Sequence, residues 1–259
     1  MKMSDWEDLS DWYDKRQGET GDLWHRGLID PVLLRLVGNC RDKAVLDLGC
    51  GNGYLSRRLA RRGAHVIAVD SSSRMIKNAR ARDPKNSLKI RYLHSNANRL
   101  GEIDDANIDL VFANMSLMDI KNAEGGIGEV CRILKRGGRF VASISHPCFD
   151  NGPNSGWIME KTIGNPARVF RRIRAYRKPS SDRIPWKLES GKKQYTRAYH
   201  RPLNWYAKVL SSNRLVITRL EEPEPTEELL AIERQNRSDL DSLGLLELPL
   251  HLVIDATKL

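Results

Sequence analysis

Val45-Leu46-Asp47-Leu48-Gly49-Cys50-Gly51-Asn52-Gly53 joins an apolar run directly to a glycine-rich turn, which is typical of the first strand and loop of a nucleotide-binding α/β sheet. The three glycines permit a tight turn and let a ligand approach the backbone closely. A helix is expected to begin near Tyr54, and the next apolar run ends at Asp70. An acid at that place can accept hydrogen bonds from both hydroxyls of a ribose, so the segment predicts a nucleoside-type ligand.

The spacing of the loop narrows the choice of nucleoside. A dinucleotide loop of the form Gly-x-Gly-x-x-Gly needs a third glycine at position 54, where this chain has Tyr54. Asp47 precedes the loop, and a carboxylate there suits an ammonium group and repels a pyrophosphate. No Lys-Ser or Lys-Thr follows the loop, which excludes the phosphate-binding Walker pattern.

Short apolar runs alternate with helical patterns over the first 145 residues, which is typical of a mostly parallel sheet covered by helices. One helix is expected to begin at Asp30-Pro31, and another follows the apolar period that includes Ile127 and Leu134 and ends at Gly137-Gly138. Two more helices are expected at Pro202–Ser211 and Thr226–Leu240. The expected strands are Ala44–Leu48, His65–Val69, Lys89–Leu93, Ile108–Ala113, Arg139–Ile144, Leu215–Leu220 and His251–Ala256.

Composition favours one globular domain over residues 1–259 with a lid-like insertion at 147–201. The sequence contains no apolar stretch of membrane-spanning length, and its acidic, Trp-rich start resembles no targeting signal, so we expect no membrane association and a cytoplasmic location. The spacing of the four cysteines fits neither a zinc site nor a redox pair, so no metal is expected.

The net charge of +10 comes from one stretch. Residues 161–201 hold 13 Lys or Arg and only two acids, Asp182 and Glu189, and the rest of the chain is nearly neutral. Three interpretations stay open: an arm that docks RNA, with Tyr176, Trp186 and Tyr195 stacking bases; a lid that attracts an anionic substrate; or a solvated surface.

The chain resembles the class I S-adenosylmethionine-dependent methyltransferases, in particular those of the type 11-like, small-molecule subfamily. The resemblance spans nearly the whole chain and is weakest over residues 150–198. It implies an α/β, Rossmann-like fold with a seven-stranded, mostly parallel sheet, helices on both faces and an antiparallel last strand. Residues 1–38 would form a helical cover. Its motifs are Leu46–Gly53, Val66–Ser72, Asn114–Ile120 and Leu134–Phe140.

The resemblance also implies how S-adenosylmethionine would be held, with S-adenosylhomocysteine as product. Asp47 and the loop at Gly49, Cys50, Gly51 and Gly53 would hold the methionine end, and Asp70 the ribose. Ser71 or Met75 would flank the adenine. Asn96-Ala97 stands where the family usually has Asp-Ala, so the adenine amino group would meet a neutral acceptor and bind somewhat more weakly. Asn114, after the fourth strand, completes the predicted donor site.

The acceptor is expected beyond the carboxyl ends of the fourth and fifth strands. His146 and His200 are candidate bases, because imidazole titrates near neutrality; the alternatives are a turn histidine beside Pro147 and a helix-capping histidine. The other predicted pocket residues are Tyr13, Trp24, His25, Leu117, Asp119, Phe149, Tyr199 and Arg201.

The leading hypothesis is methyl transfer to an O, N or C centre of a small metabolite, an anionic one if the insertion's cations face the pocket. The alternatives are an RNA methyltransferase and a non-catalytic protein that binds S-adenosylmethionine. Asn114-Met115-Ser116-Leu117 stands where nucleic-acid amino methyltransferases carry Asn/Asp-Pro-Pro-Tyr, which argues against base methylation. The chain is expected to be a monomer or a homodimer.

Overall fold

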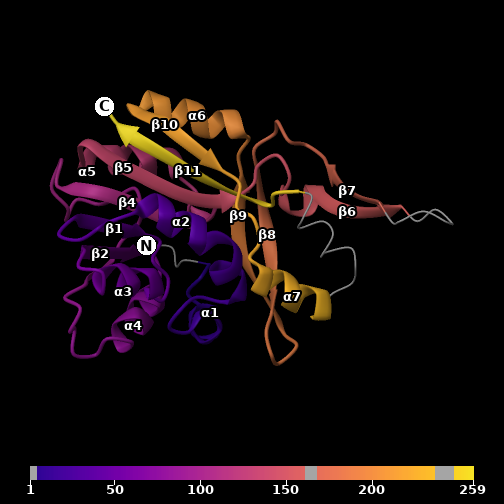
Figure 1. Cartoon of the computed structure of the whole chain (residues 1–259), viewed down its shortest axis with the longest axis horizontal. Coiled ribbons are helices and arrows are strands. Elements are labelled where there is room, and N and C mark those ends of the chain that lie inside the picture. Colours follow the sequence, from indigo (N-terminus) through magenta and orange to yellow (C-terminus); the bar gives the residue numbers. More distant parts are fainter. Residues whose placement is uncertain (1–4, 161–167, 237–247) are drawn as a thin grey trace.

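A seven-stranded sheet forms the centre of the computed structural model, which describes residues 5–160, 168–236 and 248–259 (Figure 1). Its strand order is β10-β11-β5-β4-β1-β2-β3. Strand β11 runs antiparallel to both of its neighbours, whereas the pairs from β5 to β3 are parallel. The predicted fold class is therefore confirmed. The strands are β1 Ala44–Leu48, β2 His65–Asp70, β3 Arg91–His94, β4 Ile108–Asn114, β5 Leu134–Ser145, β10 Leu215–Glu221 and β11 His251–Lys258.

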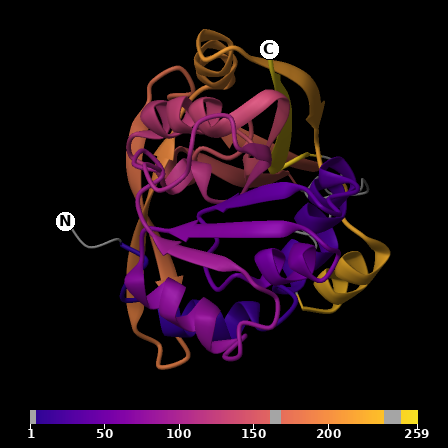
Figure 2. The same ribbon diagram turned by 90° about the vertical axis from the view of Figure 1, so that its left-hand side faces the viewer.

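Helices cover both faces of this sheet (Figure 2). Alternate residues of each strand point to opposite faces, so Leu46 of β1 packs into one apolar cluster and Val45 into the other. The first cluster is closed by α5 (Ala123–Ile133) and α6 (Leu203–Ser212), and the second by α2 (Asp30–Val37), α3 (Tyr54–Ala60) and α4 (Ser73–Ala81).

The end of α5 differs from the prediction. The helix stops at Ile133, and Gly137-Gly138, the predicted stop, lies inside β5. Leu134 is fully buried and has extended backbone angles, because it pairs with Ile108 of β4. Pairing with the sheet therefore takes precedence over the helical period that included Leu134. Of the predicted helix Thr226–Leu240, α7 occupies Glu227–Asn236, and residues 237–240 lie outside the described part.

The basic insertion contains two β-hairpins. One pairs β6 (Ser155–Glu160) with β7 (Arg168–Ile173) and extends away from the sheet (Figure 1). The other pairs β8 (Ser180–Lys187) with β9 (Lys193–His200) and leads directly into α6. The N-terminal segment, with α1 (Ser10–Gln17), lies against the β8–β9 hairpin, where Trp6 and Trp12 both stack on Trp186.

None of the described helices is long and apolar enough to cross a membrane. All four cysteines are free thiols.

Candidate functional site

The glycine loop is tied to the end of β2 by hydrogen bonds. Gly49 N and Cys50 N donate to Val69 O at 2.8 and 2.9 Å. Gly51 N donates to Asp70 Oδ2 at 2.9 Å, and Ser72 N donates to Asp70 Oδ1 at 2.8 Å. Burial raises the pKa of Asp70 above its usual value, because the charged carboxylate loses hydration. The loop and the predicted ribose-binding acid therefore form one rigid unit.

Gly49 and Gly51 allow other parts of the chain to approach the loop closely. Both have positive φ, 77° and 53°, which glycine adopts without strain. A Cβ on residue 49 would lie 2.4 Å from the Cβ of Ser116, whereas one on residue 51 would meet only the ring of Tyr13 at 3.5 Å. Ser116 Oγ donates to Leu48 O at 2.6 Å, so the segment after β4 is held against the loop.

A cleft of about 1180 Å³ runs over this loop and the ends of β2 and β4. Three predicted donor-site residues lie outside its lining: Asp47, Cys50 and Gly53. Asp47 is buried and accepts a hydrogen bond from Ser56 Oγ, and burial raises its pKa to about 7. Gly53 caps α3 instead. The predicted residues that do line the cleft are Gly49, Gly51, Asp70, Ser71, Met75, Asn96, Ala97 and Asn114.

A buried polar network fixes Asn114 at the edge of this cleft. Its Nδ2 donates to Tyr54 Oη at 2.9 Å, and its Oδ1 accepts from Ser143 Oγ at 2.6 Å. Tyr54 Oη in turn donates to Asp30 Oδ1 at 2.9 Å. The tyrosine that occupies the place of a dinucleotide loop's third glycine thus anchors α2, α3 and β4 to one another.

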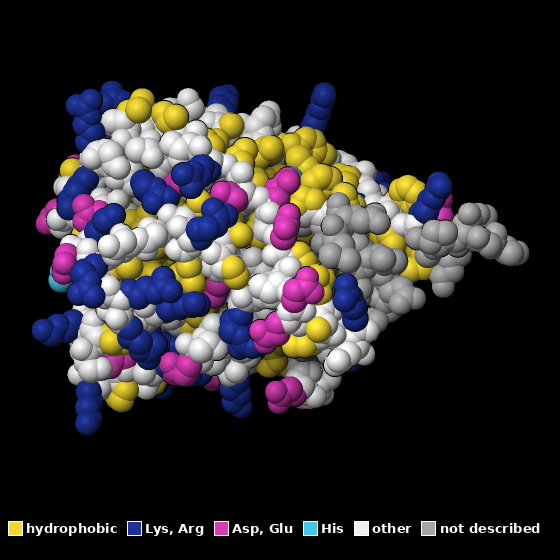
Figure 3. Space-filling view, in the orientation of Figure 1, with side chains coloured by type: hydrophobic (Ala, Val, Ile, Leu, Met, Phe, Trp, Pro, Cys, Tyr) yellow, Lys and Arg dark blue, Asp and Glu magenta, His cyan; other side chains and the backbone are white. Residues whose placement is uncertain are grey.

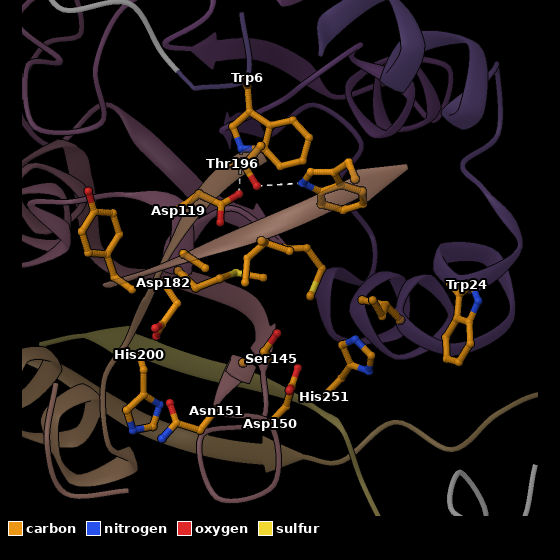
Figure 4. A pocket seen from close by; sticks show the side chains of 18 of the residues that line it. Trp6, Trp24, Asp119, Ser145, Asp150, Asn151, Asp182, Thr196, His200 and His251 are labelled. Carbon is orange, nitrogen blue, oxygen red and sulfur yellow. Dashed lines mark hydrogen bonds between the residues drawn. The ribbon is translucent and has the colours of Figure 1, made fainter. Parts of the chain in front are cut away.

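A second cavity, of about 320 Å³, adjoins the cleft beneath the N-terminal segment and the β8–β9 hairpin (Figure 4). Of the predicted pocket residues, Leu117 and Phe149 do not line it, because Leu117 is buried in the core and Phe149 packs on His146. Those that do line it are Tyr13, Trp24, His25, Asp119, Tyr199 and Arg201.

Asp119 belongs to the walls of both the cleft and the cavity. Its Oδ2 accepts a hydrogen bond of 2.9 Å from Trp6 Nε1 (Figure 4). Burial raises the pKa of Asp119 to about 7, with a further contribution from the charge of Asp70. A carboxyl group at the junction of the two spaces, with a pKa near neutrality, has the properties of a general base.

Comparisons with known proteins agree with this geometry. Residues 46–142 match the family model of a methyltransferase domain. Residues 46–142 are therefore a methyltransferase domain. A ubiquinone biosynthesis O-methyltransferase from Maricaulis maris is 35% identical to it over 100 residues, which are 38% of this chain and 39% of that protein. The chain therefore aligns with about two fifths of this curated relative.

Solved structures share the fold over most of the chain. A putative S-adenosylmethionine-dependent methyltransferase from Listeria monocytogenes is 26% identical with a TM-score of 0.67, covering 91% of this chain and 97% of that one. An S-adenosylmethionine-dependent methyltransferase from Mesorhizobium loti is 24% identical with a TM-score of 0.70, covering 88% and 96%. The predicted family is confirmed, and S-adenosylmethionine is the donor that this family uses.

The two histidines that were predicted as bases have different surroundings in the structure. His146 is buried and lines neither space: its Nε2 donates to Glu222 Oε1 at 3.0 Å and its Nδ1 accepts from Cys148 N at 3.1 Å. Burial lowers its pKa. This arrangement matches the alternative of a turn histidine, so the prediction of a base at 146 has no support in the geometry.

His200 lines the cavity. Its Nε2 donates to Tyr176 O at 2.7 Å, which fixes the tautomer and leaves Nδ1 with a free lone pair in the neutral ring. Of the two histidines that were predicted as bases, His200 is therefore the one that lines the cavity.

Several residues that the β8–β9 hairpin brings to the methyltransferase domain were not predicted from the sequence. Trp186 Nε1 donates to Thr196 Oγ1 at 2.8 Å, and the centroid of the Trp186 ring lies 5.4 Å from that of Trp6. Trp6 in turn packs edge-on against Tyr13, with 5.0 Å between the ring centroids. The signal available in the sequence was the alternation of Asp182, Ile184 and Trp186 with Arg183, Pro185 and Lys187, because in the structure every second side chain of β8 is the less exposed one. The other residues of the wall that were not predicted include Met115, Met118, Ser145, Asp150, Asn151 and Asp182.

Proposed function

We propose that this protein transfers a methyl group from S-adenosylmethionine to a small organic acceptor bound beneath the β8–β9 hairpin. The observation that carries the proposal is the wall common to both spaces. Trp6, Tyr13, Met115, Asp119 and Tyr199 line the cleft over the glycine loop and also the smaller cavity. A donor in the cleft and an acceptor in the cavity would therefore meet at Asp119.

The residues of the cleft fit the proposed donor. S-adenosylmethionine supplies an electrophilic methyl group on a sulfonium. Asp70 uses one lone pair of each oxygen for the loop and for Ser72 N, and a carboxylate has further lone pairs for ribose hydroxyls. Asn96 would accept from the adenine amino group, and the glycine loop would approach the methionine end. Asp47 is buried behind the loop, so it would influence the binding of the methionine end only through the position of the loop.

The chain's main contribution would be to hold the acceptor in line and to exclude water. Trp6 packs edge-on against Tyr13 and at a tilt against Trp186, so these three rings form one continuous wall of the cavity. Asp119 would accept the proton that an N–H or O–H acceptor loses, with His200 Nδ1 as the second group able to do so.

Little of the positive charge of the insertion faces the cavity. Among the described residues, Arg201 is the only Lys or Arg of the 147–201 insertion that lines the cavity. Arg172, Arg174 and Arg177 are exposed to solvent.

The RNA alternative is also less favoured by the arrangement of the insertion. Trp186 packs inward on Trp6, and Tyr176 Oη accepts from Leu203 N at 3.1 Å, so neither ring is presented to a base. On the face shown in Figure 3, Lys and Arg side chains are interspersed with Asp and Glu. A phosphate backbone binds most tightly to a continuous basic surface.

The experiment is a screen with S-adenosylmethionine labelled in its methyl group, against a panel of small amines, phenols and acids and against total RNA. We expect label in a small molecule, with S-adenosylhomocysteine formed in equal amount. Asp119→Asn should reduce the rate at least about 100-fold, as expected for loss of a general base, whereas the exposed control Asp104→Asn should not. Label in RNA alone, or donor binding without turnover on any acceptor, would contradict the proposal.

A further inference from the structure

We propose that the acceptor is an amine, recognised as a cation by two unpaired carboxylates and an aromatic wall. This inference rests on the proposed function and adds the chemical class of the substrate. It follows from the charges that face the cavity, from their partners, and from the rings between them.

Four aspartates line the cavity, and two of them already have cationic partners. Asp22 accepts from Arg16 Nε at 2.9 Å and from His25 Nδ1 at 2.7 Å. Asp150 pairs with Arg171 Nη2 at 3.2 Å. These two carboxylates are therefore neutralised by the protein itself.

The other two, Asp119 and Asp182, have only neutral donors. Asp119 accepts from the indole of Trp6, and Asp182 accepts from Ser180 Oγ at 2.6 Å. Neither forms an ion pair with any residue that the structure describes. A half-buried carboxylate without a counter-charge favours a cationic ligand, because desolvation weakens the competition from water.

The cations of the cavity do not balance these two acids. Arg16 is engaged by Asp22, and burial lowers the pKa of His251 to about 4, so that its ring is neutral. Arg201 donates through Nη2 to Ile120 O and Lys121 O, and its Nη1 has no hydrogen-bond partner. That Nη1 would suit a neutral oxygen elsewhere on the acceptor. Because the same Nη1 could also bind an anion, an anionic acceptor is the alternative that the experiment has to exclude.

Aromatic rings complete the recognition of a cation. Trp6, Tyr13, Trp24 and Trp186 line the cavity, and Figure 4 shows the Trp6 and Asp119 side chains joined by a hydrogen bond. Tyr199 lines it too, but the Arg201 guanidinium already lies over that ring, 5.4 Å from its centroid. The negative faces of such rings attract ammonium groups by about 0.5–2 kcal/mol each.

Proton transfer from the bound amine precedes methyl transfer. The bound ammonium gives one proton to the carboxylate of Asp119, and the nitrogen lone pair then forms the new N–CH₃ bond. The S–CH₃ bond breaks with its electron pair remaining on sulfur. The product is a methylated ammonium and S-adenosylhomocysteine.

The test compares three probes with one ring and similar length: 2-phenylethylamine, 2-phenylethanol and 3-phenylpropionate. Their binding to the S-adenosylhomocysteine complex is measured by quenching of tryptophan fluorescence, since tryptophans line the cavity. We expect the amine to bind at least about tenfold more tightly than the alcohol, and the carboxylate most weakly. If 3-phenylpropionate bound most tightly, the inference would be wrong, and the cavity would recognise an anionic acceptor through Arg201.

Two variants make the test specific. Asp182→Asn should weaken the amine about tenfold and leave the alcohol unchanged, and the exposed control Asp104→Asn should change neither. Equal losses for amine and alcohol in Asp182→Asn would contradict charge recognition. Retained affinity for S-adenosylhomocysteine shows that the variant is folded. If the unmodified protein does not bind S-adenosylhomocysteine, the proposed function itself fails, which is a different outcome from probe selectivity of the wrong sign.

Discussion

A side chain at position 49 would collide with Ser116 and would also need a positive φ of 77°. We therefore predict that Gly49→Ala lowers the free energy of unfolding by about 2–4 kcal/mol, from the backbone strain and the overpacking together. Denaturant unfolding measures this change.

Two other glycines separate these causes. Gly137 also has positive φ, but a Cβ at that position would meet nothing within 4 Å, so Gly137→Ala should cost only about 1–2 kcal/mol. Gly101→Ala introduces neither backbone strain nor a close contact, so it should leave the free energy of unfolding almost unchanged. Equal stability of the Gly49 and Gly101 variants would show that the loop does not have the described conformation.

The pKa of Asp119, which burial raises to about 7, sets the pH dependence of methyl transfer. A carboxyl group accepts a proton only when it is ionised, so kcat/KM should fall about tenfold per pH unit below pH 7 and level off above it. The measurement is a pH profile of labelled methyl transfer. Asp119→Asn should remove this titration from the pH profile. An unchanged profile in that variant would show that another group titrates.

At the scale of elements, the contact between the β8–β9 hairpin and the N-terminal segment rests on Trp186, which stacks on Trp6 and Trp12. We predict that Trp186→Ala increases amide hydrogen exchange in residues 5–17, because the segment loses its main apolar contact with the hairpin. The matched control is Tyr195→Ala, on the same hairpin with an exposed ring. Equal exchange in both variants would contradict a role for Trp186 in holding the segment.

The parallel strands and the donor cleft could be predicted because their signals are local. Leu46–Gly53 contains the strand, the loop and the helix start in one stretch, and Asp70 ends the next strand. The acceptor cavity depends instead on contacts between distant segments, such as Trp6 with Asp119 and Trp186 with Thr196 across a hairpin. His146 shows the same limit, since its position after β5 was foreseeable but its pairing with Glu222 was not.

At the scale of the whole molecule, the basic insertion places its charge mainly on the surface. We predict that changing Arg172, Arg174 and Arg177 together to Gln leaves kcat/KM on a small acceptor within about twofold, since these side chains are exposed and lie outside the cavity. The same variant should bind less tightly to a polyanion column, because the net charge falls. A loss of activity of about tenfold or more on the small acceptor would show that the charged surface takes part in substrate binding.

Every proposed step requires that the glycine loop and Asp70 bind S-adenosylmethionine, and calorimetric titration measures this binding. The unmodified protein should bind S-adenosylmethionine with one site and should not respond to NAD. Asp70→Asn should weaken the donor at least about tenfold, because charge-assisted hydrogen bonds to the ribose are lost. Binding of NAD without binding of S-adenosylmethionine, or equal donor affinity in the variant, would show that the glycine loop and Asp70 are not the donor site.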